Sequence, residues 1–224
     1  MCRILILWLG AFITTACLCH AQGVKSGRKD FAARSTMADV LGKTPFSGSL
    51  EYSGDCDEKS QELPVLPTVR VPLKDRDSSA LVMLREMFAD DHKMQVTQET
   101  GGTIRMVESD VPKELLDVTI RGLSFNNIYD PITAEAMIMS APEVQGFLKA
   151  HGIERGSDRF RLGVRGLRQG SEPGLPHTSG DLDNVSVEQA LDRLLKTFPG
   201  LWVYQNCRTE TGGRVVAFDY LRAF

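Results

Sequence analysis

Residues 183–218 read DNVSVEQALDRLLKTFPGLWVYQNCRTETGGRVVAF, and the spacing of their apolar side chains predicts one helix followed by two paired strands. Pro199-Gly200 ends the predicted helix, and the double glycine at 212–213 separates the two strand-like runs, Leu201–Gln205 and Arg214–Phe218. The helix carries apolar residues at intervals of three and four, as an amphipathic helix does: Ala190, Leu191, Leu194, Leu195 and Phe198. Together with the residues before the helix, this stretch predicts a strand–helix–strand–strand unit at 181–224.

The same order of elements is predicted at 68–110. Val69–Leu73 alternates as a strand does, and the runs Met94–Thr97 and Thr103–Val107 flank a turn. The turn sequence Glu-Thr-Gly-Gly occurs at 99–102 and again at 210–213, with two or three additional residues before the second copy. A second helical stripe lies between the strand and the turn: Ala80, Leu81, Leu84, Met87 and Phe88. We therefore predict an α+β protein with a degenerate internal repeat.

Both units resemble the short N-terminal domain shared by secretins and TonB-dependent receptors. The resemblance is carried by Val187–Leu195, Leu201–Tyr204 and Val215–Phe218, and the stretch 69–107 is similar in its corresponding positions. It covers about 75 of the 224 residues, and the sequence shows no receptor barrel, secretin channel or TonB-contact box. The resemblance implies a periplasmic recognition or assembly module that serves a secretion, pilus-like or outer-membrane transport system.

The N-terminus has the layout of a secretory signal peptide. Arg3 precedes an apolar run at 4–18. The small residues Cys19 and Ala21 then occupy the positions that a signal peptidase requires, so cleavage is expected after Ala21. An uncleaved anchor and lipidation at Cys17 are the alternatives. A flexible linker is predicted at 22–67, in which 46–52 could form a short strand. A helical insert with an Arg- and Gly-rich loop is predicted at 111–180.

Two of the five cysteines, Cys56 and Cys207, lie in the expected mature chain. An even pair in an oxidising compartment predicts a disulfide, with two separate thiols as the alternative. The net charge is −3, with acidic and basic residues interspersed, which gives no indication of nucleic acid as a partner. No second apolar run of transmembrane length follows the signal, so the mature chain is expected to be exported and to lack a transmembrane segment.

The sequence contains no recognisable enzyme motif, and we expect no catalytic, cofactor-binding or metal-binding residues. An envelope protein is the expected partner, and five residues are candidates for contacting it: the aromatic side chains Trp202 and Tyr204, and the arginines Arg159, Arg161 and Arg165 of a basic loop. Two alternatives remain open. One is a secreted hydrolase that assembles a site from distant residues such as Asp90, Asp91 and His151, and the other is a structural envelope protein without a ligand.

Overall fold

Six strands form one mixed sheet in which both predicted units take part. Its order is β2 (Met94–Gln98), β3 (Ile104–Glu108), β1 (Gly48–Asp55), β9 (Gly200–Arg208), β10 (Arg214–Arg222) and β6 (Ile153–Arg155). The computed structural model describes residues 33–42, 46–56, 66, 79–156 and 176–222. The predicted signal peptide, the predicted strand Val69–Leu73 and residues 157–175 of the Arg- and Gly-rich loop lie outside these residues.

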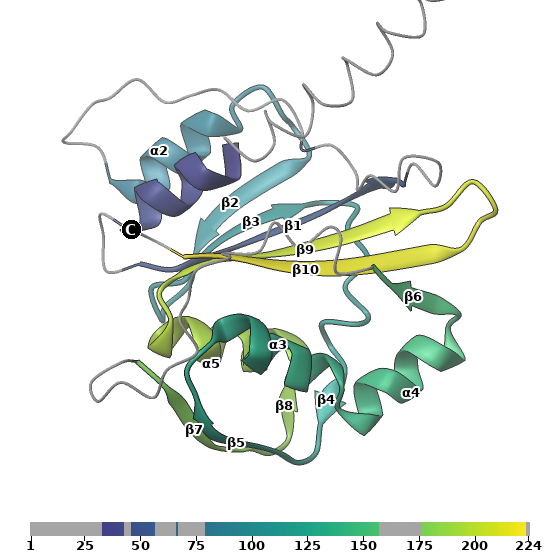
Figure 1. Ribbon diagram of the computed structural model, residues 1–224. Helices are drawn as coiled ribbons and strands as arrows, with labels where there is room; N and C mark the ends of the chain where they lie inside the picture. Colours follow the sequence, from purple (N-terminus) through teal and green to yellow (C-terminus); the bar gives the residue numbers. More distant parts are fainter. Residues whose placement is uncertain (1–32, 43–45, 57–65, 67–78, 157–175, 223–224) are drawn as a thin grey trace, which may run out of the picture.

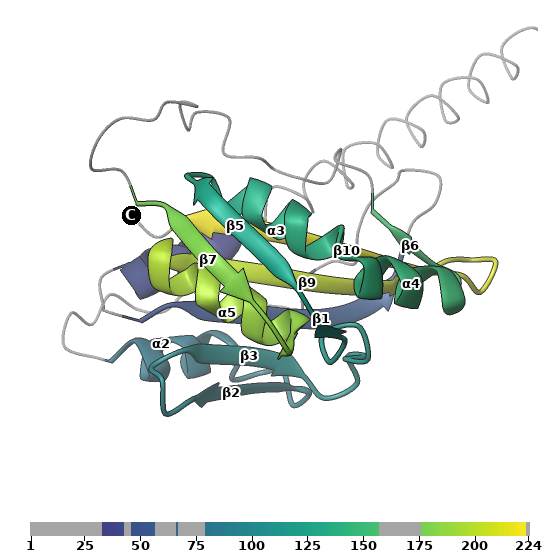
Figure 2. The same cartoon turned by 90° about the horizontal axis from the view of Figure 1, so that it is seen from below.

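Helices cover both faces of this sheet (Figure 1). Helical residues 33–42 and α2 (Ala80–Met87) lie on one face. On the other face lie α3 (Pro131–Met139), α4 (Pro142–Ala150) and α5 (Val187–Thr197). Two small antiparallel pairs complete this layer: β4 (Thr119–Ile120) with β8 (Val185–Ser186), labelled in Figure 1, and β5 (Leu123–Ile128) with β7 (Thr178–Leu182), seen in Figure 2. The expected α+β class is confirmed.

The two helix layers give the protein two apolar cores, and β9 contributes to both. All residues of this strand except the last are buried. Because successive side chains of a strand point to opposite faces, Leu201 and Val203 join the core under α2, whereas Trp202 and Tyr204 join the core around α5. The sheet is therefore a central layer, and its polar groups have to find partners within the protein.

Polar side chains fix where the helices begin. Ser186 and Gln189 form a capping box at the start of α5, because the side chain of each residue accepts the backbone N–H of the other at 3.1 Å. Asp130 accepts the backbone N–H of Thr133 at 2.9 Å and caps α3. Both caps satisfy backbone donors that have no partner within their helix.

The prediction of a flexible linker at 22–67 is wrong for residues 33–42, which are helical, and for residues 46–56, which include a strand. Residues 48–55 form β1, which confirms the alternative of a strand in this region, but the strand is central in the sheet. It runs parallel to β3 on one side and to β9 on the other. Leu50 and Tyr52 are fully buried in the core under α2. The two units are thus joined through β1 into one sheet.

The two helix–hairpin units match more closely in length than the sequence motif indicates. The helix C-caps Phe88 and Phe198 lie 110 positions apart. The turn glycines with positive φ, Gly102 at 89° and Gly212 at 84°, have the same separation. The Glu-Thr-Gly-Gly copies are 111 positions apart, so the motif is shifted by one residue within the turn. The prediction of extra residues before the second turn is therefore wrong.

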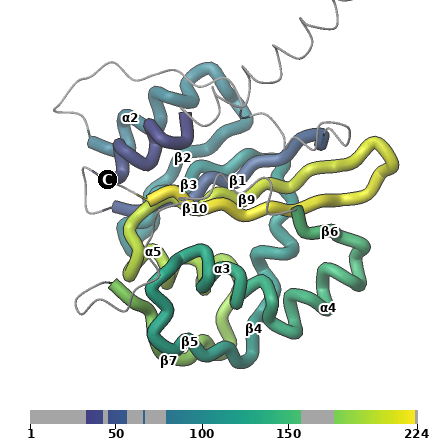
Figure 3. Tube along the Cα trace, viewed as in Figure 1, coloured from purple at the N-terminus to yellow at the C-terminus, as the bar shows by residue number. Residues whose placement is uncertain are grey.

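The two units also face in opposite directions. β2 runs antiparallel to β3 and therefore to β1, whereas β9 runs parallel to β1. A half-turn about an axis that lies in the sheet and crosses the strands reverses the strand direction and exchanges the faces. This relation places α2 and α5 on opposite faces, as Figure 1 shows. The β9–β10 hairpin is the longer of the two and extends beyond the other strands (Figure 3).

The predicted disulfide is present. Cys56, the residue after β1, is bonded to Cys207 of β9 with a Cα–Cα distance of 5.3 Å and a sequence separation of 151. The backbone N–H of Cys56 also donates to the carbonyl of Arg208 at 2.9 Å. The bond therefore ties the end of β1 to its neighbouring strand.

Replacing both cysteines, as Cys56→Ala with Cys207→Ala, should lower the free energy of unfolding by about 2–5 kcal/mol, because the unfolded chain loses a crosslink that closes a long loop. Urea unfolding followed by circular dichroism would measure this change. Reductant should lower the midpoint of the wild type and leave the double variant unchanged. Equal midpoints for the oxidised wild type and the double variant would contradict the stabilising role.

Candidate functional site

A buried ionic cluster connects the two units under α5. Arg105 of β3 has a side chain that is 9% exposed, and its guanidinium lies 2.5 Å from a carboxylate oxygen of Glu99 and 2.5 Å from one of Asp192. It also lies 3.1 Å from Glu188 of α5 and 3.6 Å from Glu51 of β1. One arginine of the first unit therefore pairs with the strand that joins the units and with the helix of the second unit.

The cluster has more carboxylates than cations. Lys113 supplies the second cation, 3.0 Å from the fully buried Glu51, and the indole N–H of Trp202 donates to Asp192 at 3.3 Å. Burial raises the pKa of Glu188 and of Asp192. Among the described residues, no group of three or more His, Cys, Asp or Glu side chains is arranged to hold a metal ion. The ion pairs between these cations and carboxylates are consistent with a structural role, in which they hold β1, β3 and α5 together.

A second feature is the outer edge of β10. The N–H of Gly156 donates to the carbonyl of Val216, so even-numbered residues of β10 direct their backbone groups away from β9. β6 pairs only with Arg214, Val215 and Val216. No described strand lies beside the rest of β10, so within the described residues the outward backbone groups of Phe218 and Arg222 and the outward carbonyl of Tyr220 have no strand partner.

Two of the residues along this edge have buried side chains. Phe218 is 6% exposed and Tyr220 is 7% exposed, and both belong to the core around α5. The N–H of Tyr220 is satisfied locally by the carboxylate of Asp219 at 2.9 Å. Natural edge strands are commonly short, charged or covered. A long apolar strand with an unpaired edge is instead a template for another strand.

The opposite edge of the sheet is protected. The guanidinium of Arg85 in α2 donates to the carbonyl of Val96 in β2 at 3.1 Å. This bond occupies the middle of the short outer edge of β2, because Met94, Val96 and Gln98 are the residues that face outward. β10 is therefore the more available of these two strands for pairing.

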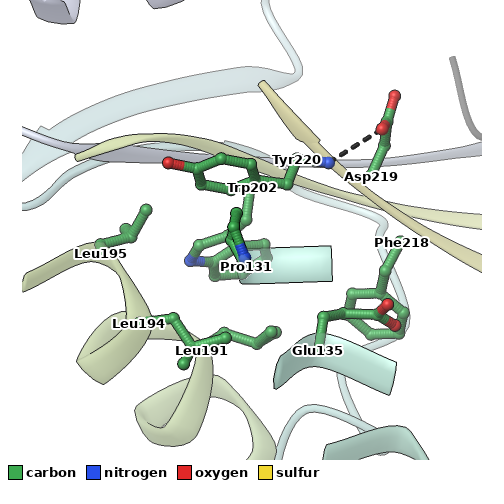
Figure 4. Close-up of a pocket in the computed structure, with 9 residues that line it drawn as sticks. All are labelled: Pro131, Glu135, Leu191, Leu194, Leu195, Trp202, Phe218, Asp219 and Tyr220. Carbon is green, nitrogen blue, oxygen red and sulfur yellow. Dashed lines mark hydrogen bonds between the residues drawn. The ribbon is translucent and has the colours of Figure 1, made fainter. Parts of the chain in front are cut away.

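A small apolar cavity of about 20 Å³ lies between β10, α3 and α5. Figure 4 shows side chains from these three elements converging on it together with Trp202 of β9, and Phe218 and Tyr220 are contributed by β10. The hydroxyl of Tyr220 is held away from the cavity by hydrogen bonds to the carbonyls of Phe198 and Pro199, at 2.8 and 2.9 Å. The cavity is lined by nine residues: Pro131, Glu135, Leu191, Leu194, Leu195, Trp202, Phe218, Asp219 and Tyr220.

The predicted contact residues do not form this site. Trp202 is 3% exposed and Tyr204 is fully buried, so these side chains are parts of the core and not a surface for a partner. The hydroxyl of Tyr204 donates to the carbonyl of Pro112 at 3.1 Å, and burial raises its pKa to about 12. Arg159, Arg161 and Arg165 lie outside the described residues. The sequence signal that was missed is that β10 has apolar side chains on both of its faces. An outer strand with one face in solvent does not require apolar side chains on that face.

The residues suggested for a hydrolase are not brought together. Asp90 and Asp91 lie between α2 and β2, and His151 lies between α4 and β6. β2 and β6 are opposite edges of a six-stranded sheet, about 24 Å apart at about 4.8 Å per strand. The helices α2 and α4 also lie on opposite faces (Figure 1).

Within the described part of the chain, no helix combines the length and the apolar character that crossing a membrane requires. Comparisons with known proteins found no matching family model, no matching curated protein and no matching solved structure.

Replacing Arg105 by alanine should lower the free energy of unfolding by about 3–5 kcal/mol, because it leaves the carboxylate of Glu51 buried with Lys113 as its one remaining cation among the described contacts. Thermal or urea unfolding would measure the loss. Lys93→Ala, which removes an exposed ion pair with Asp110, is the control and should change stability little. An Arg105→Ala protein as stable as this control would refute the role of the cluster.

Glu188→Gln should raise the urea midpoint at pH 7. Burial raises the pKa of Glu188 above its usual 4.5, so the folded state favours the protonated side chain and its ionised form lowers stability. The gain should shrink as the pH falls and disappear below about 4.5, where the wild-type side chain is protonated in both states. Unfolding curves at pH 7 and pH 4 test this, and a gain that is equal at both values would contradict it.

The open edge predicts a pattern of backbone hydrogen bonds along β10. Nuclear magnetic resonance couplings across hydrogen bonds should connect the amides of Ala217, Asp219 and Leu221 to carbonyls of β9, because these residues face that strand. The amide of Phe218 should show no such coupling in the free protein. A coupling from Phe218 to any carbonyl would show that the edge is already paired.

Proposed function

We propose that this protein is a non-enzymatic, exported recognition module of the bacterial cell envelope that binds an extended segment of a partner protein along the open edge of β10. The observation that carries the proposal is that no described strand pairs with the outward backbone groups of Phe218 and Arg222 or with the outward carbonyl of Tyr220, on a strand where Phe218 and Tyr220 are buried. Added strands gain affinity from backbone hydrogen bonds and specificity from pockets that receive alternate side chains.

The cavity under β10 supports this mode of binding. An added strand would place every second side chain on the face where Phe218 and Tyr220 already frame the apolar cavity. A volume of about 20 Å³ suits a group no larger than a methyl. The partner segment is therefore expected to present a small apolar side chain at this position.

The cellular location in the proposal comes from the sequence. The apolar run at 4–18 and the small residues that end at Ala21 support export. The disulfide between Cys56 and Cys207 is compatible with an oxidising compartment such as the periplasm. The partner is expected to be another envelope protein, and the resemblance to secretin and receptor domains points toward a secretion or transport assembly.

Arg222→Pro tests the edge directly, because it removes an outward N–H that has no strand partner in the free protein. Arg222→Ala is the matched control, since it removes the side chain but keeps the N–H. Crosslinking in the intact cell envelope, followed by purification and quantitative mass spectrometry, should recover the same partner with wild type and Arg222→Ala. Arg222→Pro should reduce recovery about fivefold, which corresponds to one lost hydrogen bond of about 1 kcal/mol.

Unfolding midpoints of the two variants should agree, which separates binding from folding. Equal capture by Arg222→Pro and Arg222→Ala would exclude β10 as the binding edge. Recovery of the monomer alone, across several crosslinker lengths, would contradict the recognition function as a whole.

A further inference from the structure

A groove of about 630 Å³ lies between α4 and β6, beside the C-terminal end of α3. It shares no lining residue with the cavity under β10, so a ligand in this groove would bind independently of a strand added along β10. The groove is lined by both apolar and cationic side chains, which together can bind a peptide. The lining consists of Ser140, Gln145, Leu148, Lys149, Ile153 and Arg155.

The charge of the lining is positive. Lys149 is exposed in the last turn of α4 and has no ion-pair partner among the described residues. Arg155 contacts Glu135 through a single terminal nitrogen, Nη2, at 3.0 and 3.3 Å from the two carboxylate oxygens. Its Nε and Nη1 atoms remain available for a second carboxylate, which arginine commonly binds in this way. None of the lining residues is acidic.

The backbone of β6 offers a second means of recognition. The N–H of Gly156 donates to β10, so the backbone groups of Glu154 and Gly156 point toward that strand. Those of Ile153 and Arg155 consequently point away from the sheet, and β6 is the last strand of the described sheet. An extended chain that paired with them would place alternate side chains beside Ile153 and Arg155, on the groove side.

We propose that this groove binds an extended acidic segment of a protein partner. A carboxylate of the segment lies between Lys149 and Arg155, and an apolar side chain two positions along the segment, on the same face, contacts Leu148 and Ile153. Free phosphate or a lipid headgroup would use the two cations but neither the apolar side chains nor the strand edge. The lining also contains no aromatic side chain on which a nucleic-acid base could stack.

The probe is a fluorescein-labelled hexapeptide, Val-Ser-Glu-Ser-Val-Ser, in which the two valines and the glutamate share one face of an extended strand. Val-Ser-Lys-Ser-Val-Ser is its counterpart, and binding of both to the mature chain is measured by fluorescence polarisation. The wild type should prefer the acidic peptide by at least tenfold. Lys149→Glu should weaken that binding at least tenfold and improve binding of the basic peptide. Lys196→Glu is the matched control, because Lys196 is likewise an exposed lysine in the last turn of a helix, α5, and should leave both affinities unchanged.

Three further results would overturn the proposal. The first is an equal effect of Lys149→Glu and Lys196→Glu, which would indicate general charge attraction. The second is undiminished binding of an acidic peptide methylated on alternate backbone nitrogens, which cannot pair with β6. The third is Lys149-dependent binding of inorganic phosphate or of phosphatidylglycerol vesicles without binding of the peptide, which would assign the groove to a small anion or a lipid surface.

Discussion

The fold depends on neutralising one carboxylate, that of Glu51, which lies fully buried in the middle of the sheet. Arg105 comes from β3 and Lys113 from the segment before β4, so the charge is balanced by residues that only the folded chain brings together. Arg105 also holds Glu188 and Asp192 of α5. Because a buried charge without a partner is strongly unfavourable, these contacts specify how β1, β3 and α5 are arranged.

This constraint explains which parts of the fold could be predicted from the sequence. The helix and hairpin at 183–218 were predicted correctly, because apolar spacing and a double glycine are local signals. β1 lies within the predicted linker, because the region around it is rich in Gly, Ser, Lys and Pro, and 46–52 was predicted there only as a possible short strand. Ser49 and Glu51 make one face of this strand polar. Both residues are fully buried, and the burial of Glu51 depends on Arg105 and Lys113, which lie more than fifty positions away. No local pattern contains that information.

The candidate site was less predictable than the fold. Cys56 and Cys207 could be paired from their number alone, since an exported chain with two cysteines has one pairing. Trp202 and Tyr204 were chosen because aromatic side chains are common at interfaces. Their burial follows from the position of β9 between β1 and β10, which depends on strand order. The open edge also follows from strand order, because the sequence of β10 does not state that β6 pairs with only three of its residues.

Strand order also accounts for the difference between the two edges of the sheet. Each unit runs helix, first strand, second strand, and both units have the same lateral order in the sheet, so the first strand lies outside in one unit and the second strand lies outside in the other. β2 directly follows α2, so Arg85 of that helix can reach its outer carbonyl. β10 is separated from α5 by the whole of β9, and no side chain of α5 reaches its edge among the described contacts. Within the described residues, the same strand order that buries the charge cluster thus leaves most of the outer side of β10 without a neighbouring strand.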